Sequence, residues 1–365
     1  MELGAVEFLE ELVSIESLSG QEQAVAEYLM MQMEARGMVA RVDEAGNAVG
    51  VRDCLDGNGC ITREIVLLGH MDTVPGRVAV RVENGRLYGR GTVDAKGPLA
   101  TFVVAAAQAQ LPPGTRVVVI GAVEEESATS KGARFVAERY RPDWCVIGEP
   151  SGWDGVTLGY KGRLLLDYEL CRPVAHTAGP EVGVAETAVA FWQAIQQYAT
   201  HYNEGHHRLF DQLLPSLRDI CTESDGLTNR VVARIGLRLP PGFESAAFEA
   251  EVQDWAGAAR VRVYGQEAAF QADRRTSLAR AFSAVIRQTG TQPRFKLKTG
   301  TADMNIVGPV WQCPIVAYGP GDSHLDHTPQ EHVLIEEYLG AIKILQRVLE
   351  TTVIGNPLSV HEVVA

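Results

Sequence analysis

The segment EIVLLGHMDTVP, residues 64–75, joins a short apolar run to His70 and Asp72, which follow it directly. Short apolar runs bounded by polar or turn-forming residues are typical of buried strands. Similar runs stand at residues 117–123 (VVVIGAV), 144–148 (WCVIG) and 314–319 (PIVAYG). Helical patterns separate these runs, so we expect an α/β fold with a mixed, mostly parallel central sheet. In such sheets the carboxyl ends of the strands border the ligand crevice, so the polar residues after the runs are expected to converge.

The composition indicates a globular protein of two domains. The chain has 365 residues, with 46% hydrophobic and 22% charged residues. A net charge of -13 disfavours nonspecific binding to nucleic acid or an anionic membrane, since both require a basic surface. The acid-rich start lacks the features of a secretory signal, and no apolar stretch approaches the roughly 20 residues that cross a bilayer. We therefore expect a cytoplasmic protein with no nucleic-acid or membrane partner.

Three stretches of the chain differ in their pattern. Residues 1–162 and 271–365 alternate helical patterns with strand-like runs, and we assign both to one catalytic domain. Residues 163–270 predict the order β-α-β-β-α-β, the split arrangement of a ferredoxin-like domain. This inserted domain holds few candidate ligands, so we expect it to be a lid or a dimerisation domain.

The residues after the apolar runs are of the types that bind metal ions. His70 and Asp72 are two apart, so on an extended segment both face the same way, and Asp72 is a candidate partner for the second ring N–H of the histidine. Asp94 lies in the glycine-rich segment GRGTVDAKG and is a candidate carboxylate bridge between two cations. Taken singly, a surface histidine before Pro75 and a simple glycine turn remain alternatives.

Further candidates are the adjacent Glu124 and Glu125, then Glu149, and His327 in a late polar loop. Two neighbouring carboxylates repel each other unless a cation or a proton separates their roles, so one of the pair is expected to bind metal and the other to accept a proton. A solvated acidic helix start running on through Glu126 is the alternative. Imidazole and carboxylate ligands without thiolate suit zinc, cobalt or manganese.

Motifs of other enzyme classes are missing from the sequence. It holds no G-x-S-x-G elbow, no P-loop and no dinucleotide-binding fingerprint in a suitable context, which disfavours serine hydrolases and nucleotide-binding enzymes. The six cysteines form no C-x-x-C pair, so we expect reduced, structural thiols. A secreted metalloprotease is disfavoured because there is no H-E-x-x-H helix.

Taken together, SLSGQE, GHMDTVP, GRGTVDAKG, the glutamate pair, GEP, TGTADMN and a closing H-x-x-x-E resemble one family nearly from end to end. This is the family of zinc aminoacylases and exopeptidases that includes acetylornithine deacetylase, succinyl-diaminopimelate desuccinylase and carboxypeptidase G. The resemblance implies two divalent ions, zinc or cobalt. It implies that one ion is bound by His70 and Glu149, the other by Glu125 and His327, and both by Asp94.

The same resemblance implies roles for residues beside the ligands. Asp72 would orient His70, and Glu124 would be the general acid and base. His327 is preferred to His324 as the ligand because Glu331 stands four residues after it. The family often has a cis peptide after the bridging aspartate, here Asp94.

His176, in CRPVAHTAGP, resembles the family's lid-domain histidine that stabilises the oxyanion in the active site of the partner subunit. That role implies a homodimer. The usual glycine-rich approach to this histidine is replaced here by Arg172, Pro173 and Val174, which is a departure from the family's pattern.

Within the family, GRGTVDAKGPLA, GYKGR and TGTADMN look most like the branch that releases lysine or ornithine from a small acidic carrier protein, LysW, in lysine and arginine biosynthesis. An acidic carrier implies a basic landing surface, for which the candidates are Lys161, Arg163, Arg230, Lys296 and Lys298. The candidates for contact with the substrate are Asn229, Arg230, Thr301 and Asn305. The alternatives are a deacylase of free acetylornithine or succinyl-diaminopimelate type, and a noncatalytic binding protein of the same fold.

Overall fold

The computed structural model describes residues 2–176 and 178–351, which form two compact units. The large unit consists of the described residues of Met1–Leu158, Ala272–Lys296 and Val307–Ala365, and the small unit consists of Gly159–Gln271 and Leu297–Ile306. We predicted that the segment Leu297–Ile306 would belong with the catalytic domain, but it packs with the small unit. The two units are described separately below.

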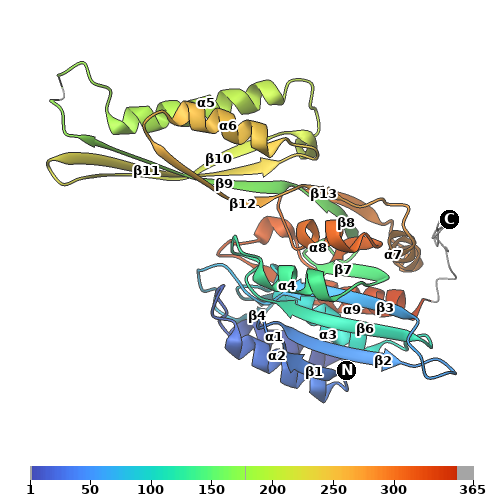
Figure 1. The fold of residues 1–365 in the computed structure, drawn as a ribbon. Helices are drawn as coiled ribbons and strands as arrows, with labels where there is room; N and C mark the ends of the chain where they lie inside the picture. The colour runs from blue at the N-terminus through green and yellow to red at the C-terminus, as the bar shows by residue number, and fades with distance from the viewer. Residues whose placement is uncertain (1, 177, 352–365) are drawn as a thin grey trace, which may run out of the picture. The chain divides into compact units, whose positions relative to one another are not determined.

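Most strands of the large unit belong to a mixed sheet with the order β1-β2-β6-β3-β7-β15-β8-β13, and β14 (Arg294–Lys298) also pairs with β8 (Figure 1). The edge strand β13 and the last residues of β8 and β14 belong to the small unit. The strands are β1 (Val39–Val42), β2 (Ala48–Cys54), β3 (Arg63–His70), β6 (Thr115–Ala122), β7 (Trp144–Gly148), β8 (Gly155–Tyr160), β13 (Phe270–Gln271) and β15 (Ile315–Tyr318). The four central strands β6, β3, β7 and β15 are parallel, and β1, β2 and β8 run antiparallel to their neighbours. The predicted fold class is confirmed.

The register brings the carboxyl ends of the four parallel strands level with one another. His70, the last residue of β3, lies opposite Ala122, the last of β6. Gly69 and Tyr318 both lie opposite Gly148 at the end of β7. Chain segments that are far apart in sequence therefore leave the sheet at one edge.

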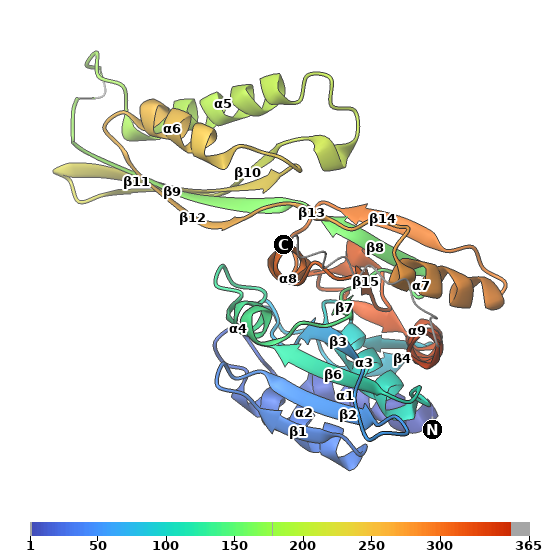
Figure 2. The same ribbon diagram turned by 45° about the vertical axis from the view of Figure 1, so that its right-hand side comes forward.

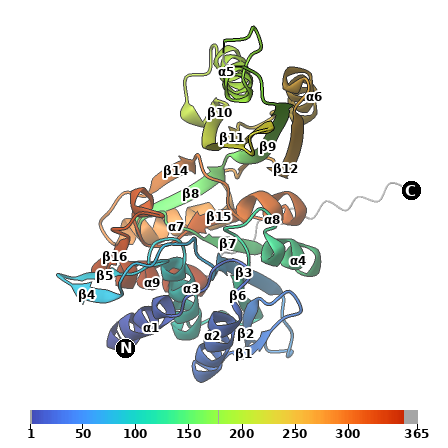
Figure 3. The same cartoon turned by 90° about the vertical axis from the view of Figure 1, so that its left-hand side faces the viewer.

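Helices cover both faces of this sheet. Figure 3 shows α1 (Glu2–Ser14), α2 (Gln23–Ala35) and α3 (Lys96–Gln108) on one side of the sheet and α4 (Lys131–Arg139) on the other. The helix α3 lies against β3, β6 and β7 and also contacts α1 and α9 (Ile335–Glu350), so nearly all of its residues are buried. The remaining helices of this region are α7 (Ser277–Gln288) and most of α8 (Met304–Trp311), whose first three residues belong to the small unit.

Close packing of α3 on the sheet explains a glycine at the end of a central strand. A Cβ atom added to Gly148 would lie 2.9 Å from the Cα of Gly69 and 3.0 Å from the Phe102 ring of α3. Such separations are shorter than normal van der Waals contact, so a larger residue would push α3 away from the sheet. The glycine keeps the strand end that precedes Glu149 against the helix.

A small three-stranded sheet, β16-β5-β4, was not predicted. It consists of β4 (Arg81–Glu83), β5 (Arg86–Tyr88) and β16 (His332–Leu334). His332 pairs with Tyr88, and the last helix begins at Ile335, directly after β16. This pairing fixes the loop after β15 next to the segment that carries Asp94.

The small unit has the predicted order of elements, β9 (Gly162–Pro173), α5 (Val184–Tyr202), β10 (Leu214–Ser224), β11 (Thr228–Leu239), α6 (Ser245–Ala256) and β12 (Arg260–Glu267) (Figure 2). Its antiparallel sheet has the strand order β10-β11-β9-β12. Alternate strand residues such as Leu166, Tyr168 and Ile235 pack against Phe191 and Phe248 of the two helices in a buried core. Among the described residues of this unit, no helix packs on the other face of this sheet.

Among the described residues, no helix is both long and apolar enough to cross a membrane.

Candidate metal centre

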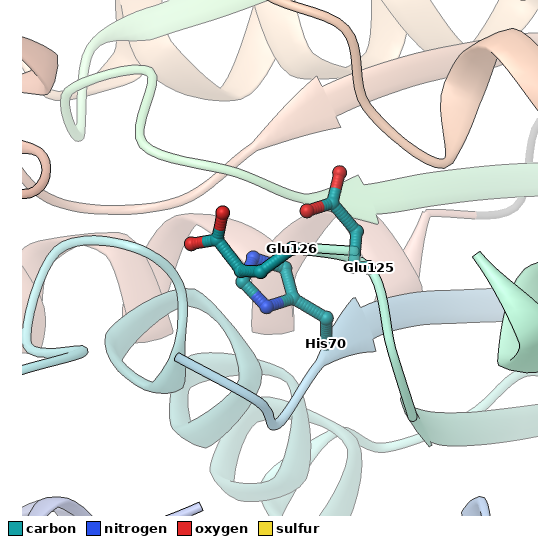
Figure 4. A group of neighbouring side chains, drawn as sticks. All are labelled: His70, Glu125 and Glu126. Carbon is teal, nitrogen blue, oxygen red and sulfur yellow. The ribbon is translucent and has the colours of Figure 1, made fainter. Parts of the chain in front are cut away.

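The predicted ligands converge at the carboxyl edge of the large unit's sheet. His70 is the last residue of β3, Glu125 and Glu126 follow β6, and Glu149 follows β7. Figure 4 shows the Glu125 and Glu126 carboxylates beside the imidazole of His70. Asp94 comes from the turn before α3, and His327 comes from the loop after β15.

His70 is held at both ring nitrogens. Its Nδ1 lies 3.0 Å from the backbone oxygen of Asp72 and 3.4 Å from the Asp72 carboxylate. Its Nε2 points the other way, 3.3 Å from Asp94 Oδ1 and 3.9 Å from Glu149 Oε1. Ligand atoms of His70, Asp94 and Glu149 all lie within 4.8 Å of one another. Asp72 thus fixes the ring while Nε2 faces a first group of carboxylates, as expected of a metal-binding histidine.

A second group shares Asp94 with the first. His327 Nε2 lies 2.9 Å from Asp94 Oδ2 and 2.9 Å from Glu126 Oε1, and the three residues form a group within 4.8 Å. The two carboxylate oxygens of Asp94 therefore face different histidines, which is the arrangement of a carboxylate that bridges two ions. The Asp94–Ala95 peptide bond is cis, as the family resemblance leads us to expect.

The glutamate pairing differs from the expected one by one residue. We expected Glu125 beside His327 and Glu124 as the acid and base, but Glu126 lies beside His327. Glu125 forms a third group with His70 and Glu126. Glu124 belongs to none of the groups found among the described residues, since its carboxylate accepts a hydrogen bond from Thr129 and lies 3.9 Å from Lys131.

Hydrogen bonds to the backbone amides of the three glutamates explain why Glu125 and Glu126, and not Glu124, face the histidines. The Asp72 carboxylate accepts from the amides of Glu125 and Glu126, each at 3.1 Å, and from the Ser19 hydroxyl. Glu22 Oε1 accepts from the amide of Glu124 at 3.0 Å. Glu124 itself has a left-handed backbone with φ of 58°, uncommon outside glycine. Carboxylates from the segment SLSGQE and from the loop after β3 thereby turn Glu124 away and direct the next two glutamates inward.

The electrostatics of the centre favour a bound cation. Burial and the neighbouring Asp94 carboxylate raise the pKa of Glu126. Burial acts to lower the pKa of His70, but hydrogen bonds to Asp72 and Asp94 outweigh it and raise the pKa. Hydrogen bonds to Asp94 and Glu126 raise the pKa of His327 to about 10. Buried carboxylates that share a site need positive charge near them, so this donor set of oxygen and imidazole nitrogen atoms fits divalent metal ions.

The residues expected to contact substrate lie in the small unit and differ in their surroundings. Asn305 is buried, and its side chain bonds to backbone groups of Ala302, Lys161 and Ala268. Thr301 donates its hydroxyl proton to the Lys161 oxygen and accepts from Arg238. These contacts give Asn305 and Thr301 structural roles in the segment that joins the small unit.

The other predicted residues of the small unit lie at its surface, with one exception. Arg230 pairs with Glu169 and Glu223, and its neighbour Asn229 is half-buried on the same strand. His176 lies in the exposed loop after β9. Lys161, expected on a basic landing surface, is fully buried and donates to backbone oxygens near Phe210.

Three residues of this centre were missed by sequence reasoning. Glu126 was set aside as part of a solvated acidic run, although three consecutive glutamates after a strand left its register open. Glu22 lies in SLSGQE and Glu331 in H-x-x-x-E, motifs that we noted without assigning these side chains a contact. Each of these glutamates lies in a motif that the sequence shows, but the residues that they contact are distant in sequence and could not be inferred from it.

Comparison with known proteins gives one family model and several relatives. The model of peptidase family M20/M25/M40 matches residues 66–351. The LysW-lysine hydrolase of Deinococcus radiodurans is 47% identical over 362 residues, which cover 96% of this chain and 98% of that protein.

Solved structures show the same fold at low identity. A tripeptidase from Staphylococcus aureus superposes with a TM-score of 0.75 at 18% identity, covering 96% of this chain and 98% of that one. An M20 family metallo-carboxypeptidase from Sulfolobus solfataricus gives a TM-score of 0.72 at 18% identity, covering 95% and 98%. At this identity the two structures bear on the fold alone.

Proposed function

The chain belongs to peptidase family M20/M25/M40, and from that premise we propose that it releases lysine, or ornithine, from a LysW-like acidic carrier protein. It is a metal-dependent hydrolase that acts on a linear amide bond. In the proposed substrate this amide joins the α-amino group of the amino acid to the terminal glutamate side chain of the carrier. The observation that carries the proposal is the 47% identity to a LysW-lysine hydrolase along nearly the whole of both chains.

Two groups of side chains would hold the metal ions. We assign His70, Glu149 and Asp94 to one ion, and Glu126, His327 and Asp94 to the other, with Glu126 replacing Glu125 from the sequence-based assignment. The ligand types favour zinc, with cobalt as a second choice. When bound, such ions polarise the substrate carbonyl and lower the pKa of water.

We assign the acid and base role to Glu125 in place of Glu124. The Glu125 carboxylate lies near His70 and Glu126, and its backbone amide is fixed by Asp72. It takes a proton from the water whose oxygen attacks the amide carbon. When the carbon–nitrogen bond breaks, Glu125 returns that proton to the leaving α-amino nitrogen. The products are the free amino acid and the carrier with a free glutamate carboxylate.

A homodimer in the cytoplasm, acting in lysine or arginine biosynthesis, is part of the same proposal. His176 lies exposed on the small unit, with the amide of Ala178 donating to its Nδ1 at 3.1 Å. In the dimer, Nε2 of His176 is the atom proposed to reach the oxyanion in the active site of the partner subunit. The exposure of the side chain is compatible with that role.

The helix-free face of the small unit's sheet supports an acidic partner, although the chain as a whole is acidic. Residues on this face alternate with core residues such as Leu166 and Ile235. Arg218 packs over Gly236 on this face, where burial and the like charges of Arg163 and Arg234 lower its pKa. The arginines on this face are Arg163, Arg218, Arg230, Arg234, Arg238, Arg260 and Arg262. On the same face Arg230 pairs with Glu169 and Glu223, and Arg234 pairs with Asp167. The exposed Arg260 and Arg262 are therefore the positions that we propose for attraction of an acidic protein.

Reversing charge on this face tests the carrier proposal. The double substitution Arg260→Glu and Arg262→Glu is expected to raise KM for carrier-bound lysine about tenfold or more and to leave kcat nearly unchanged, since surface charges act mainly on association. The increase is expected to shrink in high salt. Arg280→Glu, an exposed position in α7 of the large unit, is the control and should leave KM unchanged. Equal KM values for the wild type, the double variant and the Arg280→Glu control would show that this face does not bind the carrier.

The substrate itself is tested by direct comparison. We expect rapid release of lysine or ornithine from the carrier conjugate and slow turnover of free acetylornithine, measured as free amino acid under identical conditions. Fast turnover of acetylornithine together with no release from the carrier conjugate would favour a small-molecule deacylase instead.

A further inference from the structure

Glu331 is a fully buried carboxylate with an unusual set of partners. Its Oε1 accepts hydrogen bonds from the backbone amides of Gly91, Val93 and Asp94, at 2.9, 3.1 and 3.2 Å. Its Oε2 accepts from Arg90 Nη1 at 2.7 Å. One side chain therefore holds most of the turn that presents Asp94.

The turn that carries Asp94 depends on these contacts because it is not part of the hydrogen-bond pattern of a helix or sheet. Residues 89–95 lie outside the helices and strands, between β5 and α3. Gly91 has a left-handed backbone with φ of 88°, and a Cβ atom there would lie 3.0 Å from Thr73. Buried amides need acceptors, and here the acceptor is supplied by a side chain 237 to 240 positions away in sequence.

Glu331 also belongs to the segment that carries the second histidine. His327 stands four residues earlier, and the backbone oxygen of Thr328 accepts from Arg90 Nη1 at 3.4 Å. The amide of Gly89 donates to the Glu331 backbone oxygen at 3.3 Å. Side chain, backbone and ion pair thus join the Asp94 turn to the His327 loop.

We infer that Glu331 is a positioning residue that sets the separation of Asp94 and His327, and thereby the affinity of the metal site that these two residues share with Glu126. This role rests on the ligands assigned under the proposed function, and Glu331 is not itself one of those ligands. Glu331 acts through the backbone of Asp94, since its carboxylate oxygens are engaged by Arg90 and the three amides. Replacing a residue that holds a metal ligand without touching the metal typically changes metal affinity by about 10- to 100-fold.

The test is a cobalt titration of metal-free protein followed by visible absorption. Glu331→Gln keeps the size of the side chain but places an amide NH₂ or an uncharged oxygen against Arg90. We expect one of two cobalt-binding events to weaken about 10- to 100-fold and its absorption band to change. At saturating cobalt, KM for the carrier conjugate should stay near the wild-type value. A purely structural role would lower thermal stability and leave both affinities and both bands unchanged.

The matched control is Asp56→Asn. Asp56 Oδ1 likewise accepts from two backbone amides of a loop, those of Asn58 and Cys60, each at 2.8 Å. That loop carries no proposed ligand, so cobalt affinity should equal that of the wild type. If Glu331→Gln fails to fold, Arg90→Gln removes the cation that holds Oε2 and should weaken the same event by a smaller factor.

The outcomes separate this inference from the proposed function. Wild-type protein that binds two cobalt ions, with variants of equal affinity, would overturn the role of Glu331 alone. Wild-type protein that binds no cobalt would instead overturn the ligand assignment on which the role depends.

Discussion

Replacing Glu125 by glutamine is expected to lower kcat by about 10² to 10⁴ while metal content stays at the wild-type level. The reason is that the amide of glutamine cannot accept and return the proton, although it fills the same space beside His70 and Glu126. The measurement is steady-state kinetics on the carrier conjugate together with metal analysis of the purified protein.

Glu124→Gln is the matched control for that experiment. Glu124 is adjacent in sequence, but its carboxylate lies against Thr129 and Lys131. Its kcat should stay within a small factor of the wild-type value. A large loss in Glu124→Gln with normal kcat in Glu125→Gln would restore the assignment that the sequence alone favoured.

Removing metal ions with a chelator is expected to abolish turnover and to lower the unfolding temperature. Asp94, Glu126 and Glu149 gather carboxylates in a largely buried region, and a bound cation offsets their repulsion. An ion present at about 1,000 times its Kd stabilises the folded state by about 4 kcal/mol. Calorimetry of metal-free protein with and without added zinc, with turnover assayed in parallel, measures both effects.

Asp94→Asn should remove most of the zinc-dependent rise in unfolding temperature, since this residue faces both groups. Cys60→Ser, a change at an exposed thiol away from the centre, is the control and should keep the full rise. Full turnover after exhaustive chelation, with no residual metal, would contradict the metal assignment.

The architecture could be predicted because it follows from local patterns. Each central strand is a short apolar run, and parallel pairing brings the strand ends level, so the sequence predicts that His70 and Glu149 lie at one edge of the sheet. The small unit was predicted from the order of its helices and strands. The pairing of β16 with β5 was not, because the segment from His332 to Leu334 is too short to show a period of its own.

The register of the three glutamates depends on contacts that no local pattern encodes. The strand β6 ends at Ala122, one residue before the end of the apolar run, and Glu124 then takes a left-handed backbone. Acceptors on Glu22 and Asp72, each more than 50 residues away in sequence, fix that turn. The alternation of side chains along an extended strand therefore does not predict which glutamate faces the histidines.

The prediction for Lys161 was wrong because its side chain is buried. Lys161 was expected on a basic surface, yet burial lowers its pKa to about 8 and backbone oxygens surround its amine. Lys161 stands between Tyr160 and Gly162, and these neighbours give no sequence signal that its side chain is buried. The arginines of the helix-free face lie instead mainly on β11 and β12, with Arg163 on β9, and their common side becomes visible only when the strands are placed in register.

We propose that Asp94 lies between two cations, with His70 and Glu149 on one side and Glu126 and His327 on the other. The most direct test is a crystal structure of zinc-loaded protein with anomalous scattering at the zinc edge. We predict two peaks about 3.5 to 4 Å apart, bridged by the two oxygens of Asp94. A single peak, or two peaks with Glu125 in place of Glu126 beside His327, would contradict this account.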